Sequence, residues 1–201
     1  MTKIHLFDFD GTITRHDSFT GFIRHVHGVG GLLRVLLVSA PAIILWKTGL
    51  RSNTYAKLRM FAAAFKGMPA EEFRHAGETY ADRINRMVRP EIKAALNAAV
   101  SHGETTAIVS ASLGDWIRPW AAGQGVGTVI ATEAETGPDG RLTGRFSRPN
   151  CQHAEKVRRI IEAFPQLADS RSEFHVTAYG DSDGDSDMLG FADEGIRVRH
   201  S

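Results

Sequence analysis

The chain has 201 residues, of which 42% are hydrophobic and 23% are charged, and its formal net charge is +1. These values are ordinary for a soluble globular protein, and the length allows one sizeable core with an inserted subdomain. The single cysteine, Cys151, excludes an internal disulfide framework and suits a reducing cytoplasm. No cleavable signal peptide is visible, and no aromatic-and-basic motif indicates nucleic-acid binding. We therefore expect a cytoplasmic protein without a nucleic-acid partner.

The first part of the chain predicts one strand followed by helices. Residues 3–7 are typical of a short buried strand, and residues 8–12 are typical of a turn after it. Apolar residues then recur at three- and four-residue spacing, and glycine and proline separate the helical stretches. We expect helices over residues 18–29, 32–47, 53–65 and 70–88. They indicate an all-helical cap inserted over residues 15–88.

From residue 89 onward, helices and strands alternate. Ser112 to Asp115 resembles a capping box that begins the helix after the second strand. Alternation of this kind indicates a mostly parallel sheet with helices on both faces. The fold class is therefore α/β, with a Rossmann-like sheet formed by residues 1–14 and 89–201, plus the cap. We expect helices over residues 90–101, 154–164 and 185–192, strands over residues 105–109, 128–131, 174–179 and 196–198, and a hairpin over residues 133–146.

Residues 32–50 are rich in leucine, isoleucine and valine. The uncharged run within them, residues 35–46, is only 12 residues long, short of the ~20 that a helix needs to span a bilayer. One interpretation is a buried cap helix. The other is a pair of helices that touches a membrane surface, which would place the protein peripherally at the inner face of the membrane.

Charge is distributed unevenly along the chain. Residues 18–70 contain seven lysines and arginines and no aspartate or glutamate. Because the whole chain has a net charge of +1, the remaining residues have a net charge of −6. A basic lobe beside an acidic site would attract an anionic substrate or rest on anionic lipid. The alternative is an ordinary solvated basic surface.

Polar side chains follow three of the predicted apolar strands. Asp8, Ser110 and Asp181 each stand where a strand ends, and the carboxyl ends of parallel strands meet at one edge of a sheet. Asp10 and Asp185 add two further carboxylates nearby in sequence. Adjacent carboxylates repel unless a cation separates them, and hard oxygen ligands suit Mg²⁺. We therefore predict a magnesium site at this edge.

A bound phosphate would also need hydrogen-bond donors. Ser110 can offer a hydroxyl, and Lys156 can supply a positive charge from the first turns of its helix. Each of these residues alone is a weak signal, but together and in this order they point to phosphoryl chemistry. A calcium loop over the aspartates after residue 180 is excluded, because Ser186 and Ala192 replace its glycine and its bidentate glutamate.

These motifs resemble the haloacid dehalogenase-like superfamily of phosphohydrolases over the whole chain. Residues 8–12 resemble its first motif, residues 108–110 its second, Lys156 its third, and residues 180–182 with Asp185 its fourth. The helical insertion is similar to the C1 cap of its phosphoserine phosphatase-like subgroup, subfamily IB. His153 departs from the subgroup, whose members commonly have glycine there.

The resemblance implies a mechanism with a phospho-aspartyl intermediate. Asp8 would attack phosphorus, and Asp10 would protonate the leaving oxygen and then deprotonate water. Ser110 and Lys156 would bind phosphate. Mg²⁺ would be bound by the Asp8 carboxylate, the Asp10 carbonyl and Asp181. Asp185 and Thr12 would orient these ligands without contacting the metal themselves.

The substrate is expected to depend on the cap. Asp17 stands where phosphoserine phosphatases usually place a glutamate that recognises the substrate amine, but their cap arginine would fall near Phe61. Arg59 is a substitute candidate, although helical spacing directs it elsewhere. The basic, leucine-rich cap with Arg51 is similar to that of phosphatidylglycerophosphatase C-type proteins, which handle a lipid phosphate. A phosphotransferase with the same intermediate, and a non-catalytic phosphate-binding module, are the remaining alternatives; the oligomeric state stays open.

Overall fold

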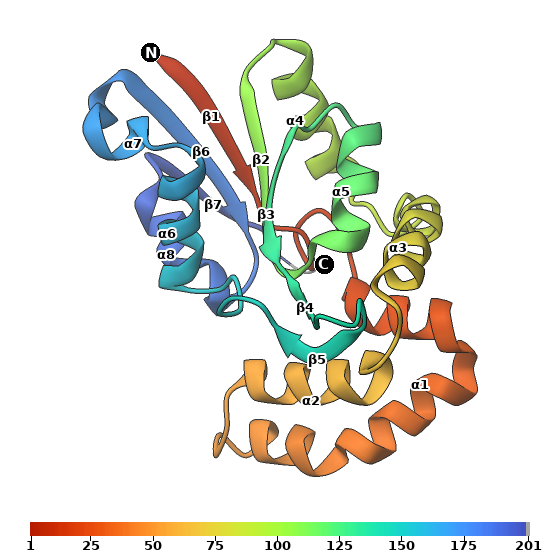
Figure 1. The fold of residues 1–201 in the computed structure, drawn as a ribbon. Coiled ribbons are helices and arrows are strands. Elements are labelled where there is room, and N and C mark those ends of the chain that lie inside the picture. The colour runs from red at the N-terminus through yellow and green to blue at the C-terminus, as the bar shows by residue number, and fades with distance from the viewer. Residues whose placement is uncertain (200–201) are drawn as a thin grey trace.

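The computed structural model describes residues 1–199 of the chain, and its centre is a parallel sheet. Five strands lie in the order β3-β2-β1-β6-β7, and every neighbouring pair is parallel. Helices cover both faces of this sheet (Figure 1). The predicted α/β class is confirmed. The strands are β1 (Thr2–Phe7), β2 (Thr105–Leu113), β3 (Thr128–Thr132), β6 (Phe174–Gly180) and β7 (Glu194–Arg197).

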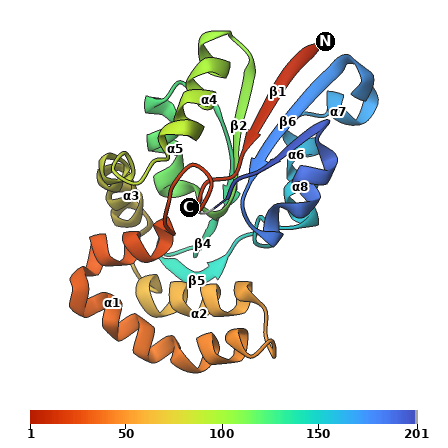
Figure 2. The ribbon, with the colours of Figure 1, turned by 180° about the vertical axis from the view of Figure 1, so that it is seen from behind.

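The sheet is buried on both faces because its central strands are apolar at consecutive positions. Leu6 and Val109 belong to one hydrophobic cluster, whereas Phe7 and Ile108 belong to the other. Strands covered on both sides show such continuous apolar runs. Figure 2 shows the helix layers from behind. The helices of the first layer are α4 (Pro90–Ser101) and α5 (Gly114–Gly123), and those of the second are α6 (Ala154–Ala163), α7 (Gln166–Asp169) and α8 (Ser186–Phe191).

Three helices follow β1 before the chain returns to the sheet. They are α1 (Ser18–Lys47), α2 (Asn53–Phe65) and α3 (Ala70–Ile84). Helix α1 breaks at Gly28, which has a φ of 69°, a left-handed value that glycine adopts without strain. The two helices expected over residues 18–29 and 32–47 are therefore joined at a kink and form one element. Helices α1 and α2 pack together beyond the carboxyl ends of the strands, whereas α3 lies along α5 (Figure 1). The treatment of residues 15–88 as one cap stays a prediction.

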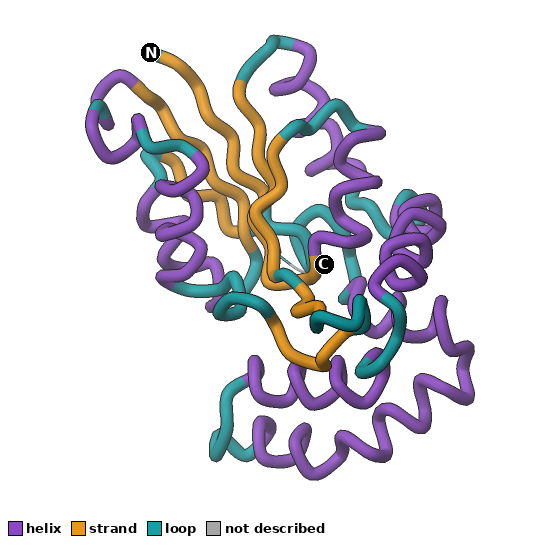
Figure 3. Tube along the Cα trace, viewed as in Figure 1, coloured by secondary structure: helices purple, strands orange, loops and turns teal. Residues whose placement is uncertain are grey.

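The predicted hairpin is confirmed, and it connects the core to the cap. Its strands, β4 (Ala134–Thr136) and β5 (Leu142–Phe146), are antiparallel. Leu142 exchanges two backbone hydrogen bonds with the α2–α3 turn: its O accepts from Gly67 N at 2.8 Å, and its N donates to Met68 O at 2.9 Å. Figure 3 shows the hairpin between the sheet and α2. The cap is therefore held on the core by backbone hydrogen bonds as well as by packing.

The capping box predicted at Ser112 is wrong. Strand β2 continues to Leu113, and α5 begins at Gly114 without a side-chain cap. The strand is longer than expected because its last residues are still buried in the sheet. Ser112 is therefore a buried strand residue whose hydroxyl is directed to the site described below. A capping box does occur after β6. There the side chains of Ser182 and Asp185 each accept a hydrogen bond from the backbone N–H of the other residue.

Candidate active site

The carboxyl ends of the central strands and the cap enclose a pocket of about 610 Å³. The core contributes acidic, hydroxyl and amine side chains, and the cap contributes both charged and uncharged ones. Its position agrees with the rule that ligands of open α/β sheets bind beyond the strand carboxyl ends. The titratable side chains that line it are Asp8, Asp10, Asp17, Arg51, Lys57, His153, Lys156, Asp183 and Asp185.

Asp8 and Lys156 form a buried ion pair at the bottom of this pocket. Lys156 Nζ lies 2.6 Å from Asp8 Oδ1, 2.6 Å from the carbonyl oxygen of Val109 and 2.6 Å from Asp185 Oδ1. The lysine side chain is 1% exposed, so its ammonium meets protein acceptors in place of water. Burial alone would lower the pKa of Lys156, but Asp8 and Asp185 raise it above the ordinary value for lysine. Lys156 is therefore a permanent cation beside Asp8.

Asp8 is a buried carboxyl group in an acidic neighbourhood. Burial raises its pKa to about 8; Lys156 opposes this rise, and Asp185 and Asp181 add to it. One oxygen each of Asp8, Asp181 and Asp185 lie within 4.8 Å of one another. A divalent cation among these oxygens would relieve their repulsion and lower the pKa of Asp8. The donor set therefore fits Mg²⁺, which takes carboxylate oxygens and keeps several waters.

Thr12 and Gly11 position Asp181. The hydroxyl of Thr12, which is fully buried, donates to Asp181 Oδ1 at 3.0 Å. Gly11 has a φ of 84°, and a Cβ at this residue would collide with the Asp181 carboxylate. The turn after β1 thus needs glycine both for its backbone conformation and for the close approach of Asp181. The support predicted for Thr12 agrees with this contact.

The second carboxylate oxygen of Asp185 holds the loop that follows β6. Asp185 Oδ2 accepts hydrogen bonds from Ser182 N at 2.9 Å, Ser182 Oγ at 2.7 Å and Asp181 N at 3.2 Å. Lys156 and these hydrogen bonds lower the pKa of Asp185 even though burial acts to raise it. Asp185 therefore carries a stable negative charge and orients both Lys156 and the Asp181 loop.

Asp10 is fixed by donors from three segments. Its Oδ1 accepts from Ser18 N at 2.8 Å and from the Thr14 hydroxyl at 3.4 Å, and its Oδ2 accepts from the Ser112 hydroxyl. Burial raises the pKa of Asp10 above its ordinary value, and Asp17 adds to the rise, whereas Lys57 and Ser112 oppose it. A carboxyl with a raised pKa is suited to hold and release a proton during catalysis.

Lys57 links the cap to the residues around Asp10. From α2, its Nζ donates to the Ala111 carbonyl oxygen at 3.0 Å and to Ser112 Oγ at 3.2 Å, and it lies 5.3 Å from the Phe19 ring centroid. In the sequence, Lys57 is one of the seven cations between residues 18 and 70, and Ser112 matches the pattern of a helix cap. No local pattern identifies either residue, because their contact joins segments 55 residues apart.

Ser110 lies at the bottom of the pocket with its hydroxyl in position to donate. The side chain is 1% exposed, and its Oγ accepts a hydrogen bond from Ser112 N at 3.0 Å. A hydroxyl that accepts in this way keeps its own proton for another acceptor. Ser110 and Lys156 thus place a donor and a cation at the carboxyl end of β2, as the phosphate-binding prediction requires.

Comparison with known proteins identifies the family of this site. A family model for haloacid dehalogenase-like hydrolases matches residues 5–190. The chain belongs to this family. Protein CicA of Caulobacter vibrioides is a relative with 32% identity over 194 residues, which cover 96% of this chain and 84% of CicA. The resemblance inferred from the sequence motifs is confirmed at the family level, whereas the narrower subgroup and cap type stay predictions.

Solved structures show that this hydrolase shares its fold with phosphatases. A protein of unknown function from Bordetella pertussis Tohama I has a TM-score of 0.77 at 22% identity, covering 96% of this chain and 87% of that one. A phosphoserine phosphatase with a phospho-aspartyl intermediate analogue has a TM-score of 0.65 at 19% identity, covering 95% and 83%. Identities this low establish the fold. Together with the family match, these neighbours support a phosphatase.

The three predicted cap residues of this hydrolase lie in different places. Asp17 lines the pocket, but its carboxylate also caps α1 by accepting from Phe19 N and Thr20 N. Arg51 lies at the pocket rim, 5.5 Å from the Tyr55 ring centroid. Arg59 does not line this pocket; it lines two smaller cavities beside α2. Its role as a substrate ligand stays a prediction that this position does not support.

His153 has a strained backbone at the edge of the site. Its φ of 51° is the one positive value found at a non-glycine residue among residues 1–199. Its N–H donates to the Gly184 carbonyl oxygen at 2.7 Å, which fixes the loop before α6. The glycine that the resemblance implies at this position would adopt such a conformation without strain.

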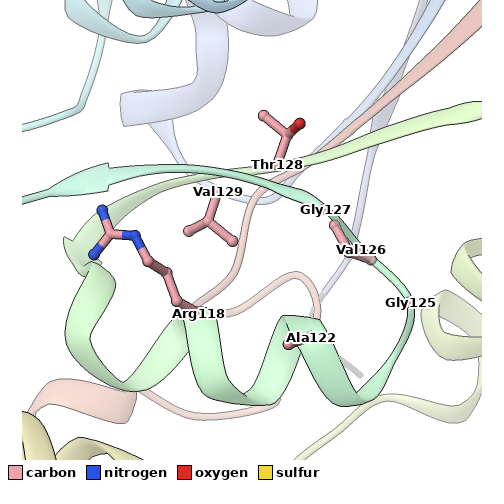
Figure 4. A pocket seen from close by; sticks show the side chains of 7 residues that line it. All are labelled: Arg118, Ala122, Gly125, Val126, Gly127, Thr128 and Val129. Carbon is pink, nitrogen blue, oxygen red and sulfur yellow. The ribbon is translucent and has the colours of Figure 1, made fainter.

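A second cavity of about 590 Å³ lies at the opposite end of β3 (Figure 4). Its one charged side chain, Arg118, is paired with Glu133, and no carboxylate is among its lining residues. It therefore lacks the carboxylate cluster that the first pocket has. The lining residues are Arg118, Ala122, Gly125, Val126, Gly127, Thr128 and Val129.

Proposed function

We propose that this hydrolase is a Mg²⁺-dependent phosphomonoesterase that forms a phospho-aspartyl intermediate at Asp8. The observation that supports this most directly is the cluster around Asp8. A buried carboxylate contacts Lys156 at 2.6 Å, has two further aspartates within 4.8 Å, and opens into a 610 Å³ pocket. Such a cluster combines a nucleophile, a fixed cation and the oxygen ligands of a metal.

In the first step, a carboxylate oxygen of Asp8 attacks phosphorus and the bond from phosphorus to the ester oxygen breaks. The leaving alkoxide takes a proton from Asp10, whose raised pKa favours the protonated form of this carboxyl group. Lys156 and the Ser110 hydroxyl offset the negative charge on the phosphoryl oxygens. The products are a free alcohol and an acyl phosphate on Asp8.

In the second step, water replaces the alcohol. Asp10, now ionised, takes a proton from this water, whose oxygen attacks phosphorus while the bond from phosphorus to Asp8 breaks. Inorganic phosphate leaves, and Asp8 and Asp10 return to their initial states. Mg²⁺, held by Asp8, Asp181 and the Asp10 carbonyl, would supply positive charge that keeps Asp8 ionised and draws electron density from phosphorus.

The substrate that we propose is a phosphomonoester of a small or lipid alcohol. The pocket contains Arg51 and Lys57 on its cap side, so the substrate's phosphate end meets positive charge from both the cap and the core. Asp17 is also present, but its two backbone hydrogen bonds already give it a structural role. Arg59, the candidate partner for a substrate carboxylate, does not line the pocket, which makes phosphoserine a weaker candidate.

The test is turnover of a generic aryl phosphate with and without Mg²⁺. Asp8→Asn should lower kcat by roughly a thousandfold or more, because the nucleophile is removed. Asp10→Asn should lower it by roughly a hundredfold or more and still bind phosphate. Asp82→Asn, an exposed aspartate on α3, is the matched control and should leave kcat unchanged.

Acid quenching during turnover of a phosphorus-labelled substrate should trap label on the wild-type protein in a hydroxylamine-sensitive bond. The Asp8→Asn variant should trap none. Near-normal Mg²⁺-dependent activity in that variant would rule out Asp8 as the nucleophile. Added alcohols should compete with water for the intermediate only weakly; efficient transfer to them would instead identify a phosphotransferase.

A further inference from the structure

The outer side of α1 exposes an apolar strip. The large hydrophobic residues that the structure exposes within residues 1–199, Met1 aside, all lie between residues 29 and 50. Leu37 is 75% exposed and Leu50 is 72% exposed, so these side chains lie in water. Isolated exposed leucines are common, but a contiguous group marks a binding surface. The apolar strip consists of Val29, Leu33, Leu37, Val38, Ile44 and Leu50, and Trp46, which is 36% exposed, lies near its end.

The strip lies on the side of α1 that does not face the protein. Val29, Leu33, Leu37 and Ile44 are separated by four, four and seven residues, so they share one side of the helix. Residues on the other side are buried at the junction with α2. Helix α1 is long and apolar enough to cross a membrane, and only 17% of its most apolar stretch is buried inside the protein. It is therefore apolar on both sides and covered on one.

The charges around the strip are exclusively basic over a long stretch. Arg34, Lys47 and Arg51 are exposed beside it, and residues 18–70 contain no aspartate or glutamate. Lys47 Nζ lies 5.1 Å from the Trp46 ring centroid. Tryptophan beside lysine and arginine, next to aliphatic side chains, is typical of segments at the boundary between lipid headgroups and acyl chains. An anionic surface is the charge complement of this face.

The strip also reaches the mouth of the catalytic pocket. Leu50, at the end of the strip, stands in the α1–α2 connection between Gly49 and Arg51, which line the pocket together with Trp46. In Figure 1 this connection lies at the edge of the cap, at the end of α1 remote from its break. A surface that covers the strip would therefore extend to the pocket rim.

We propose that the apolar strip docks this protein on the surface of an anionic lipid bilayer, with the pocket rim beside the lipid headgroups. Aliphatic side chains would enter the boundary layer, and the flanking arginines and lysine would contact anionic headgroups. Helix α1 lies along the bilayer and does not cross it, because its inner side packs on α2 and its first turns contact Trp116. The docking is independent of the proposed phosphatase function.

Vesicle sedimentation tests the proposal with the full chain. Wild-type protein should pellet with phosphatidylcholine vesicles that contain phosphatidylglycerol, and weakly with phosphatidylcholine alone; added salt should reduce the difference. Leu37→Glu should weaken binding about tenfold or more, since it removes one leucine that would enter the lipid and adds a charge that anionic headgroups repel. Arg34→Gln should weaken binding only to the anionic vesicles. Each variant should keep wild-type turnover of a soluble aryl phosphate.

Two matched controls isolate the surface. Ala94→Glu adds the same charge on exposed α4, and Arg86→Gln removes a cation outside the strip; both should bind vesicles as the wild type does. Absence of wild-type binding to either vesicle overturns the proposal while leaving the phosphatase assignment intact. Two other results also overturn it: a dimer that Leu37→Glu dissociates without any vesicle binding, or vesicle association that resists alkaline carbonate and thus indicates a spanning helix.

Discussion

The hydroxyl of Ser112 donates a hydrogen bond to Oδ2 of Asp10, although the two residues are 102 positions apart. Ser112 Oγ in turn accepts a hydrogen bond from Lys57 of the cap at 3.2 Å. The proposed acid–base residue is thus connected to a cap lysine through a single hydroxyl. A shift of Lys57 relative to the core would therefore affect the protonation of Asp10 through this hydroxyl.

Ser112→Ala should slow turnover and shift its pH dependence. The hydrogen bond from Ser112 lowers the pKa of Asp10, so its loss raises that pKa further. Because the first step needs protonated Asp10, the alkaline limb of the kcat profile should move to higher pH. At pH values below this limb, we expect kcat to fall about tenfold, because the Asp10 carboxylate that forms in the first step loses one hydrogen bond. Ser101→Ala, on the exposed end of α4, should change neither quantity; a loss of kcat without a pH shift would indicate a purely structural role for Ser112.

Gly11→Ala should weaken Mg²⁺ activation. A methyl group at residue 11 would meet the Asp181 carboxylate in a backbone conformation with φ of 84°, so Asp181 would move. Displacement of one ligand should raise the Mg²⁺ concentration for half-maximal activity by about tenfold or more. Gly103→Ala is the matched control, because Gly103 also has a positive φ, 68°, but open space around it. It should lower stability without changing the Mg²⁺ titration; equal titrations for both variants would contradict the contact.

His153→Gly should stabilise the protein against urea. The positive φ of 51° is costly for any side chain with a Cβ. After allowance for the greater freedom of glycine in the unfolded chain, the gain should be roughly 1 kcal/mol. His153→Ala keeps the Cβ and should show no gain. If alanine and glycine stabilised equally, the imidazole and not the backbone would be the source of the cost.

Metal-free protein should lose stability as the pH rises. Burial raises the pKa of Asp8 from 3.8 to about 8, so between these values the folded state holds a proton that the unfolded chain has released. This contribution is complete below 3.8 and is lost as the pH passes through about 8. The Tm in the presence of a chelator should therefore fall over this range, and Mg²⁺ should restore it most at the upper end.

The Asp8→Asn variant is the control for that measurement. Asparagine does not titrate, so the Tm of the variant should fall less steeply with pH than that of the wild type. Mg²⁺ should also raise its Tm less, because one carboxylate ligand is missing. Parallel Tm profiles for the two proteins would show that Asp8 is not the group whose proton is lost.

The convergence of Asp8, Ser110 and Asp181 could be predicted from the sequence because it depends on strands alone. Each residue follows a continuous apolar run, and parallel strands bring their carboxyl ends to one edge whatever the intervening loops do. Lys156 was predicted for a related reason, since it lies in the first turn of a helix that packs on this sheet. The fold class followed from the same alternation of strands and helices.

Contacts between the cap and the core could not be predicted in this way. The role of Ser112 depends on how far β2 extends past Ser110, and the role of Lys57 depends on where α2 sits above that strand. Helical spacing did direct Arg59 away from the site, but it could not show which way α2 faces. Likewise, the sequence offered two interpretations of residues 32–50, and only the structure shows that one side of α1 is covered and the other exposed.

The three acceptors around Lys156 have a consequence for the whole reaction cycle. All three N–H groups of this ammonium are already directed to Asp8, Val109 and Asp185, so an arriving phosphoryl group does not fill a gap. It takes over the hydrogen bond of a carboxylate that has just given up its charge in bonding to phosphorus. The number of negatively charged partners around this ammonium is therefore the same in the ionised resting site and in the intermediate.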